Sequence, residues 1–192
     1  MEAKQLKIIA FVGMPGSGKG TCTDYLHEKY GWPIVHFGHM FYEEMQRRGL
    51  DNVKDENWFR PKLREEQGPD VLAKLAAAKA EALAKDDQTR IVFDGLYTWG
   101  EYTYLRQKFG DSLLVIAVTA PRQERYRRIL SRHDEHRKYT SAEQIQAREI
   151  TEIEEIDKGG PIAIADYTLT NDTEPTHMTT RLDAILAETK LV

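Results

Sequence analysis

The sequence predicts an α/β fold in which a mainly parallel β-sheet is covered by helices on both faces. Short apolar runs rich in Ile and Val alternate with longer helical stretches along the 192 residues. The first of these runs stops at a glycine-rich turn that opens a helix. Strands that are separated by helices need crossover connections, and such connections give parallel strands.

Sequence patterns and chain breakers place the individual elements. "LKIIAFV" is short, apolar and stops at Gly13, as a buried parallel strand does. "VLAKLAAAKAEALAK" favours a helix by propensity alone, Pro121 is expected at the first position of a helix, and "SAEQ" at 141–144 matches a capping box. In chain order we expect a strand at 6–12, a helix at 19–30, a strand at 33–37, a helix ending at Gly49, helical structure at 56–85 interrupted at Gly68 and Pro69, strands at 90–95 and 112–120, helices at 121–132 and 141–158, a strand at 166–171, and a last helix closing near Glu188.

Composition restricts the class of protein. With 192 residues, 41% of them hydrophobic, we expect one compact domain over 1–192. The net charge of -4 argues against a protein that coats nucleic acid. The single cysteine, Cys22, excludes an internal disulfide and a CxxC zinc site. Because no apolar run approaches the roughly 20 residues of a membrane span, we expect a cytoplasmic protein without a membrane partner; the sequence leaves monomer and dimer equally open.

A phosphate-binding loop is predicted at "GMPGSGKGT", residues 13–21. Gly13, Gly18 and Lys19 fit GxxxxGK[ST], a loop whose backbone N–H groups surround phosphates while the lysine reaches the outer ones. The motif directly follows the first strand and opens a helix, which is where such a loop belongs. The Ser or Thr expected after the lysine is displaced by one position, since Gly20 follows the lysine and Thr21 comes next.

This displaced loop resembles the GxPGxGKGT loop of adenylate kinases and related nucleoside monophosphate kinases. Further segments resemble mainly archaeal predicted nucleotide kinases that are adenylate-kinase-related or dephospho-CoA-kinase-like: "HFGHMFYEEMQRRGL", "LREEQGPDVLAKL", "VFDGLYTWGEYTYLRQKFGDSLLVIAVTAP" and "PIAIADYTLTND". The resemblance implies a three-layer P-loop kinase fold with sheet order 2-3-1-4-5. It also implies an acceptor-binding helical region at about 38–88 and a short helical lid at about 133–140.

The donor side of such a site needs cations and a metal ion around the phosphates. Lys19 is expected to contact the β- and γ-phosphates of ATP, and Thr21 to hold a phosphate oxygen or approach Mg²⁺. Asp94 ends the third strand and is expected to bind Mg²⁺, partly through water, or to orient the acceptor; a turn or cap role is the alternative. The remaining expected nucleotide contacts are Gly13, Pro15, Gly16, Ser17, Gly18 and Gly20.

The basic segment 121–138 holds a second group of candidates. Arg128 and Arg132 lie one helical turn apart, with Arg125 nearby. They resemble the RxxxR of adenylate kinases, which implies that Arg128 lies near the nucleotide base and that Arg132 is catalytic. Arg148 resembles a further lid arginine. Solvent-exposed surface charge is the expectation for Arg122, Arg127 and Lys138.

Two HxxH pairs raise the question of a metal site. They are His36 with His39 and His133 with His136. Neither pair has a third ligand placed with it, so metal binding is not favoured.

The acceptor side departs from the adenylate kinase pattern. Tyr42 and Thr98 stand where that family has its two acceptor-phosphate arginines, and His39 replaces an aspartate. Arg47, Arg48, Arg60 or Arg64 could compensate, and Arg64 best matches the related archaeal group. The aromatic residues in this region either stack on a base or pack in the core: Tyr42, Trp58, Tyr97, Trp99 and Tyr102. The expected substrate contacts are Arg64, Tyr42, Tyr97 and Arg148.

Two functions remain open from the sequence. One is an ATP-dependent kinase acting on a nucleoside monophosphate or similar small molecule, with dephospho-CoA as a variant. The other is a non-catalytic ATP-binding sensor or assembly factor. Lys19, Asp94 and the lid arginines favour the kinase, whereas Tyr42 and Thr98 favour the sensor or an unusual acceptor. A cleft lined by Arg64 and Tyr97 would support transfer, and a filled one would support the sensor.

Overall fold

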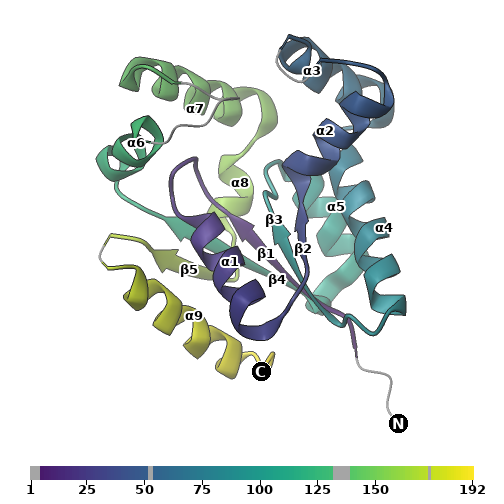
Figure 1. Cartoon of the computed structure of the whole chain (residues 1–192), viewed down its shortest axis with the longest axis vertical. Helices are drawn as coiled ribbons and strands as arrows, with labels where there is room; N and C mark the ends of the chain where they lie inside the picture. Colours follow the sequence, from purple (N-terminus) through teal and green to yellow (C-terminus); the bar gives the residue numbers. More distant parts are fainter. Residues whose placement is uncertain (1–4, 52–53, 132–138, 173) are drawn as a thin grey trace.

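A five-stranded parallel sheet forms the centre of the molecule in the computed structural model, which describes residues 5–51, 54–131, 139–172 and 174–192. The strands lie in the order β2-β3-β1-β4-β5, and all four described pairings are parallel (Figure 1). The expected α/β fold and the strand order implied by the resemblance are confirmed. The strands are β1 (Lys7–Val12), β2 (Ile34–His36), β3 (Arg90–Asp94), β4 (Leu113–Thr119) and β5 (Tyr167–Thr170).

Helices cover both faces of the sheet because the alternate side chains of its central strand are apolar. Ile9 and Phe11 of β1 pack with one group of helices, and Ile8 and Ala10 pack with the other. All four side chains are fully buried, which is typical of a strand covered on both sides. One face is covered by α1 (Lys19–Tyr30) and α9 (Pro175–Glu188), and the other mainly by α2 (Phe37–Arg47), α3 (Glu56–Gln67), α4 (Val71–Lys85) and α5 (Trp99–Phe109).

Two further helices approach the loop that follows β1. Helix α6 (Arg122–Leu130) packs against α7 (Ala142–Ile156), and a short α8 (Gly159–Ala163) leads back to the sheet. Figure 1 shows α6 and α7 on one side of this loop, with α2 and α3 on the other. Residues from α3 and α7 therefore come to the same end of the sheet as the loop.

Two helices were not expected, α5 and the short α8, and several element ends differ, such as Phe37, which begins α2 instead of ending a strand. Helix α5 was not predicted, although "TWGE" carries its capping box: the Thr98 hydroxyl accepts from the Glu101 N–H at 3.0 Å, and the Glu101 carboxylate accepts from the Thr98 N–H at 3.1 Å. Pro121 is the N-cap of α6 rather than its first helical residue. Helix α7 ends at Ile156 because Asp157 takes a left-handed conformation with φ of 50°.

No helix in the described parts of the chain is both long enough and apolar enough to cross a membrane.

The one thiol of the chain is predicted to be unreactive in the native state. Cys22 lies fully buried in α1, and burial raises the pKa of its thiol to about 12, against the opposing effect of Lys19. Since only the thiolate attacks disulfide reagents, we expect native Cys22 to react with dithiobisnitrobenzoate at pH 8 at least about a hundredfold more slowly than in guanidinium chloride. Equal rates in the two conditions would contradict the burial of this side chain.

Candidate functional site

The loop between β1 and α1 has the backbone shape of an anion site. Gly13 has a φ of +148°, and a Cβ there would lie 2.3 Å from the Val118 carbonyl oxygen. Gly18 is the N-cap of α1 in a left-handed conformation, so no side chain caps the first turn, and that turn contains no acidic residue. The first N–H groups of a helix have no partner within the helix. Together with the helix dipole they favour a negatively charged ligand.

Lys19 brings a positive charge to this loop. Its Nζ donates to the carbonyl oxygens of Gly13 at 2.9 Å and Met14 at 3.3 Å. The side chain lines a cavity of about 260 Å³. Pro15, Gly16, Gly18 and Gly20 line the same cavity. The loop, the helix N-terminus and the lysine therefore meet at one concave site.

Two residues of the loop lie differently from the expectation. The Ser17 N–H, expected to face a phosphate, donates to the Met14 carbonyl oxygen at 3.2 Å within the loop. The buried Ser17 hydroxyl has no hydrogen-bond partner among the described residues. Thr21 is exposed and lies outside the cavity lining. Replacing Gly20 by a residue with a Cβ would meet no atom within 4 Å, so space is not the reason for the displaced hydroxyl.

Asp94 lies at the carboxyl end of β3 and lines the same cavity as Lys19. Its Oδ2 is 3.1 Å from Nδ1 of His36, whose ring lies tilted against that of His39 with centroids 4.5 Å apart. Among the described residues, no group of three or more His, Cys, Asp or Glu side chains could hold a metal ion. Mg²⁺ at phosphate sites needs only one or two carboxylates besides the phosphates. Asp94 fits that requirement.

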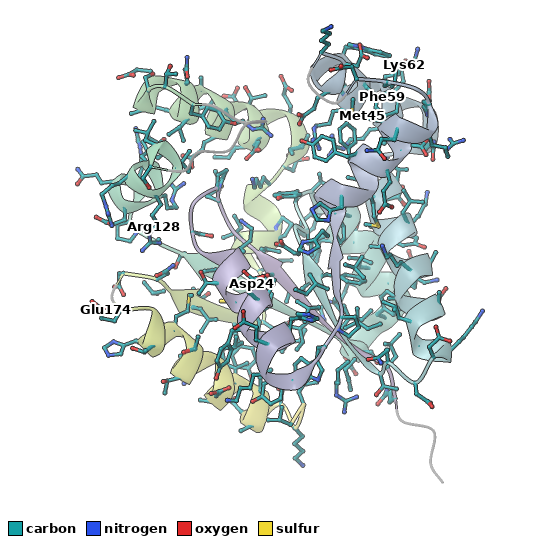
Figure 2. All side chains as sticks on the ribbon, viewed as in Figure 1. Asp24, Met45, Phe59, Lys62, Arg128 and Glu174 are labelled. Carbon is teal, nitrogen blue, oxygen red and sulfur yellow. The ribbon has the colours of Figure 1, made fainter. Side chains whose placement is uncertain are left out.

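Two arginines of α6, Arg125 and Arg128, contact the loop. Figure 2 labels Arg128. This arginine donates to the Gly16 carbonyl oxygen at 3.4 Å and to the backbone and side-chain oxygens of Asn171 at 3.2 and 3.3 Å. Arg125 is buried, donates to the Pro15 carbonyl oxygen at 3.3 Å and forms an ion pair with Glu149 of α7. The expected lid arginine Arg132 and the pair His133 and His136 lie outside the described residues.

A second cavity of about 540 Å³ adjoins the first, between α3 and α7. Tyr97, Arg148 and Glu152 line both cavities and so form the wall between them. The other residues of the second cavity combine two arginines and one carboxylate with polar and apolar side chains: Arg60, Pro61, Arg64, Thr151, Glu155 and Ile156. The sequence singled out Arg64, Tyr97 and Arg148, and the structure brings these three together.

Arg64 is half-buried beside a buried carboxylate. Its Nη2 is 3.9 Å from Oε1 of Glu101, which is fully buried. Burial raises the pKa of Glu101 despite the opposing effect of Arg64, and it lowers the pKa of Arg64. Arginine starts from so high a value that it stays charged at neutral pH. Neither the Arg64 Nε nor Glu101 Oε1 has a hydrogen-bond partner among the described residues.

The two positions that lack the expected arginines have structural roles. Thr98 caps α5. The Tyr42 hydroxyl donates to Glu56 at 3.1 Å, and Tyr42 lies outside the lining of both cavities. Arg47 and Arg48 pair with Glu44 instead of facing either cavity. The positive charge of the second cavity therefore comes from α3 and α7.

Sequence reasoning missed Lys158 and Glu152. Both line the first cavity, and they form an ion pair with each other. Lys158 was read as the end of a helix, and only the turn-forming "DKGG" at 157–160 indicates that it lies beyond one. The position of its ammonium group depends on how α7 meets the loop, which local sequence does not specify.

The chain is similar to an AAA domain family and to UPF0200 proteins. The model of the AAA domain family matches residues 12–146. A UPF0200 protein of Thermococcus kodakarensis is 35% identical over 170 residues, which cover 86% of this chain and 88% of that protein.

Solved structures share the fold at low identity. A shikimate kinase from Bacteroides thetaiotaomicron superposes with a TM-score of 0.59 at 13% identity, covering 94% of this chain and 98% of that one. A gluconokinase from Sinorhizobium meliloti 1021 gives a TM-score of 0.56 at 15% identity, covering 98% and 94%. At these identities the similarity shows the fold and does not extend to a substrate.

Proposed function

We propose that this chain, which belongs to the AAA domain family and to the UPF0200 proteins, is an ATP-dependent small-molecule kinase. It transfers the γ-phosphate of ATP to a nucleoside monophosphate or a similar phosphorylated acceptor. One observation carries the proposal: the loop cavity and the arginine-lined cavity share the wall formed by Tyr97, Arg148 and Glu152. Two adjoining sites of this kind allow donor and acceptor to meet in line.

The donor belongs in the loop cavity. Lys19 and the N-terminus of α1 provide positive charge for the β- and γ-phosphates. Bound Mg²⁺ would neutralise charge on those phosphates, and Asp94 is the residue that would hold it, directly or through water. Thr21, which is exposed and lies outside the cavity lining, is a second candidate. Arg128 is assigned to the nucleotide side because it joins the loop to Asn171 at the end of β5. Arg132 remains the proposed catalytic arginine, at the base of the proposed lid at about 133–140.

The acceptor belongs in the second cavity, within the proposed acceptor region at about 38–88 and α7. Arg60, Arg64 and Arg148 favour an anionic group, and arginine binds phosphate through two parallel hydrogen bonds. Pro61, Tyr97 and Ile156 offer apolar contacts for a base or another flat group. This supports a phosphorylated acceptor more than a neutral sugar, with dephospho-CoA as the variant. Charge from Arg60 and Arg64 compensates for the arginines absent at Tyr42 and Thr98.

The alternative is an ATP-binding sensor without transfer. Tyr42 and Thr98 favour it, since they replace two acceptor arginines. A cavity of about 540 Å³ lined by Arg64 and Tyr97 favours transfer, since a protein that only senses ATP has no need of a second anion site beside the first.

A phosphoryl-transfer screen distinguishes the two. The purified protein is incubated with ATP and Mg²⁺ and with nucleoside monophosphates, deoxynucleoside monophosphates or dephospho-CoA, and the products are separated by chromatography. Lys19→Ala is the blank. We expect one acceptor, or one narrow group, to give a phosphorylated product. ADP formation that no acceptor changes would favour the sensor.

Arg64→Met tests the acceptor assignment. We expect the acceptor KM to rise by at least about tenfold, because a charge-assisted contact is lost, while nucleotide affinity stays within about twofold. Arg47→Met is the matched control, since Arg47 is exposed, pairs with Glu44 and lines neither cavity. An unchanged acceptor KM in a folded Arg64→Met protein would remove Arg64 from the acceptor site.

A further inference from the structure

Lys158 is a buried lysine that lines the loop cavity together with Lys19, although it lies far from the loop in the sequence. It follows α7, where the left-handed Asp157 turns the chain, and only 2% of Lys158 is exposed. Its N–H donates to the Glu152 carbonyl oxygen at 3.2 Å, which fixes its backbone to the last turns of α7. Lysine is almost never buried to this degree unless it is paired, so its contacts indicate why it is there.

The ammonium group of Lys158 lies between an anion and an aromatic face. Its Nζ donates to Glu152 Oε2 and lies 4.6 Å from the centre of the Tyr97 ring. Glu152 also accepts from Arg148 Nε at 3.0 Å. Burial alone would raise the pKa of Glu152, but Lys158 and Arg148 prevail and hold it below its usual value. Glu152 is therefore an ionised carboxylate shared by two cations.

The charges around the loop cavity favour a further anion. Among the described residues that line it, Lys19, Arg148 and Lys158 are cations, and Asp94 and Glu152 carry carboxylates. A single arginine would satisfy the charge of Glu152. Burying Lys158 at this cavity as well costs desolvation energy, and a polyphosphate in the same cavity would offset that cost.

We propose that Lys158 is a second phosphate-binding lysine, which contacts the terminal phosphates of the nucleotide from the α7 side of the cavity. Without bound phosphate, Glu152 accepts from the Lys158 ammonium group next to the Tyr97 ring, and it competes with phosphate for that group. The identity of the ligand as a nucleotide rests on the proposed kinase function, whereas the anion site itself does not. Lys158 also supplies positive charge next to Tyr97 and Glu152, two residues of the wall that the cavities share.

Binding of inorganic tripolyphosphate, measured by calorimetry without Mg²⁺, tests Lys158 independently of turnover. We expect Lys158→Met to weaken binding by at least about tenfold, since it removes a charge-assisted contact, and Lys158→Arg to recover most of that loss. Lys108→Met is the matched control, because Lys108 also pairs with a glutamate and lies near an aromatic ring, yet lines neither nucleotide nor acceptor cavity. Its affinity should stay within about twofold of the wild type.

Glu152→Gln separates a phosphate contact from a merely structural ion pair. If Lys158 served only to neutralise Glu152, Lys158→Met and Glu152→Gln would break the same ion pair. The two variants would then change tripolyphosphate binding in the same direction. If Lys158 binds phosphate, Glu152→Gln removes a competing anion and tripolyphosphate should bind more tightly by at least about threefold. Because glutamine keeps the shape of the glutamate side chain, Glu152→Gln still tests the role of Lys158 if the Lys158→Met protein does not fold.

The outcomes distinguish this inference from the proposed function. A folded Lys158→Met protein that binds tripolyphosphate like the wild type, or a Glu152→Gln protein that binds it more weakly, overturns the role of Lys158 even if transfer occurs. Weakened binding in Lys158→Met together with no transfer to any acceptor would support the anion site and contradict the kinase. With an active wild type, we expect Lys158→Met to lower kcat more than it raises the acceptor KM.

Discussion

Lys19→Ala is expected to lower phosphoryl transfer by at least about a hundredfold, because it removes the cation that stabilises charge on the transferring phosphates. The fold should remain intact. The Lys19 ammonium group donates to the carbonyl oxygens of Gly13 and Met14, which lie in its own loop. Initial rates at saturating ATP and thermal melts followed by circular dichroism measure the two effects separately.

The control for Lys19→Ala is Lys74→Ala. Lys74 lies on α4, pairs with Asp70 across one helical turn and lines neither cavity. Its rate should equal that of the wild type. A Lys19→Ala protein that keeps near-wild-type turnover would show that the loop is not the donor site.

Glu149→Ala is expected to lower the free energy of unfolding by about 3–5 kcal/mol, because it leaves the buried Arg125 without its carboxylate. The Tyr126 hydroxyl, which donates to Glu149 at 3.0 Å, loses its acceptor as well. This ion pair joins α6 to α7, and Arg125 also donates to Pro15 in the loop. We therefore expect ATP affinity to fall along with stability.

Urea unfolding measures the effect of Glu149→Ala, and Glu124→Ala is its control. Glu124 pairs with Arg127 on the surface of α6, where an ion pair contributes little to stability. A Glu149→Ala protein as stable as Glu124→Ala would show that α7 is not held to α6 by this pair.

The basic segment shows what sequence could and could not predict. Spacing alone placed Arg125 and Arg128 on one side of α6, and both contact the loop. The partner of Arg125 lies 24 residues away on α7, and no local pattern specifies which helices meet. For the same reason Lys158 and Glu152 were missed, whereas Arg148 was found through the resemblance.

The sheet and the loop were more predictable because their signals are local. Each strand is a short apolar run, and the glycines of the loop take backbone conformations that other residues avoid. Helix α5 could also have been found, since Thr98 and Glu101 form a capping box that is readable from sequence. That box also explains why Thr98 stands where an arginine was expected.

The most direct test of the two-cavity kinase is to follow the γ-phosphate itself. The protein is supplied with ATP labelled at the γ-phosphorus, Mg²⁺ and the acceptor found in the screen, and the label is measured in acceptor and in inorganic phosphate. We predict that most of the label reaches the acceptor and that Arg64→Met shifts it toward inorganic phosphate. Label that appears only in inorganic phosphate, at a rate that no acceptor changes, would contradict the proposed kinase.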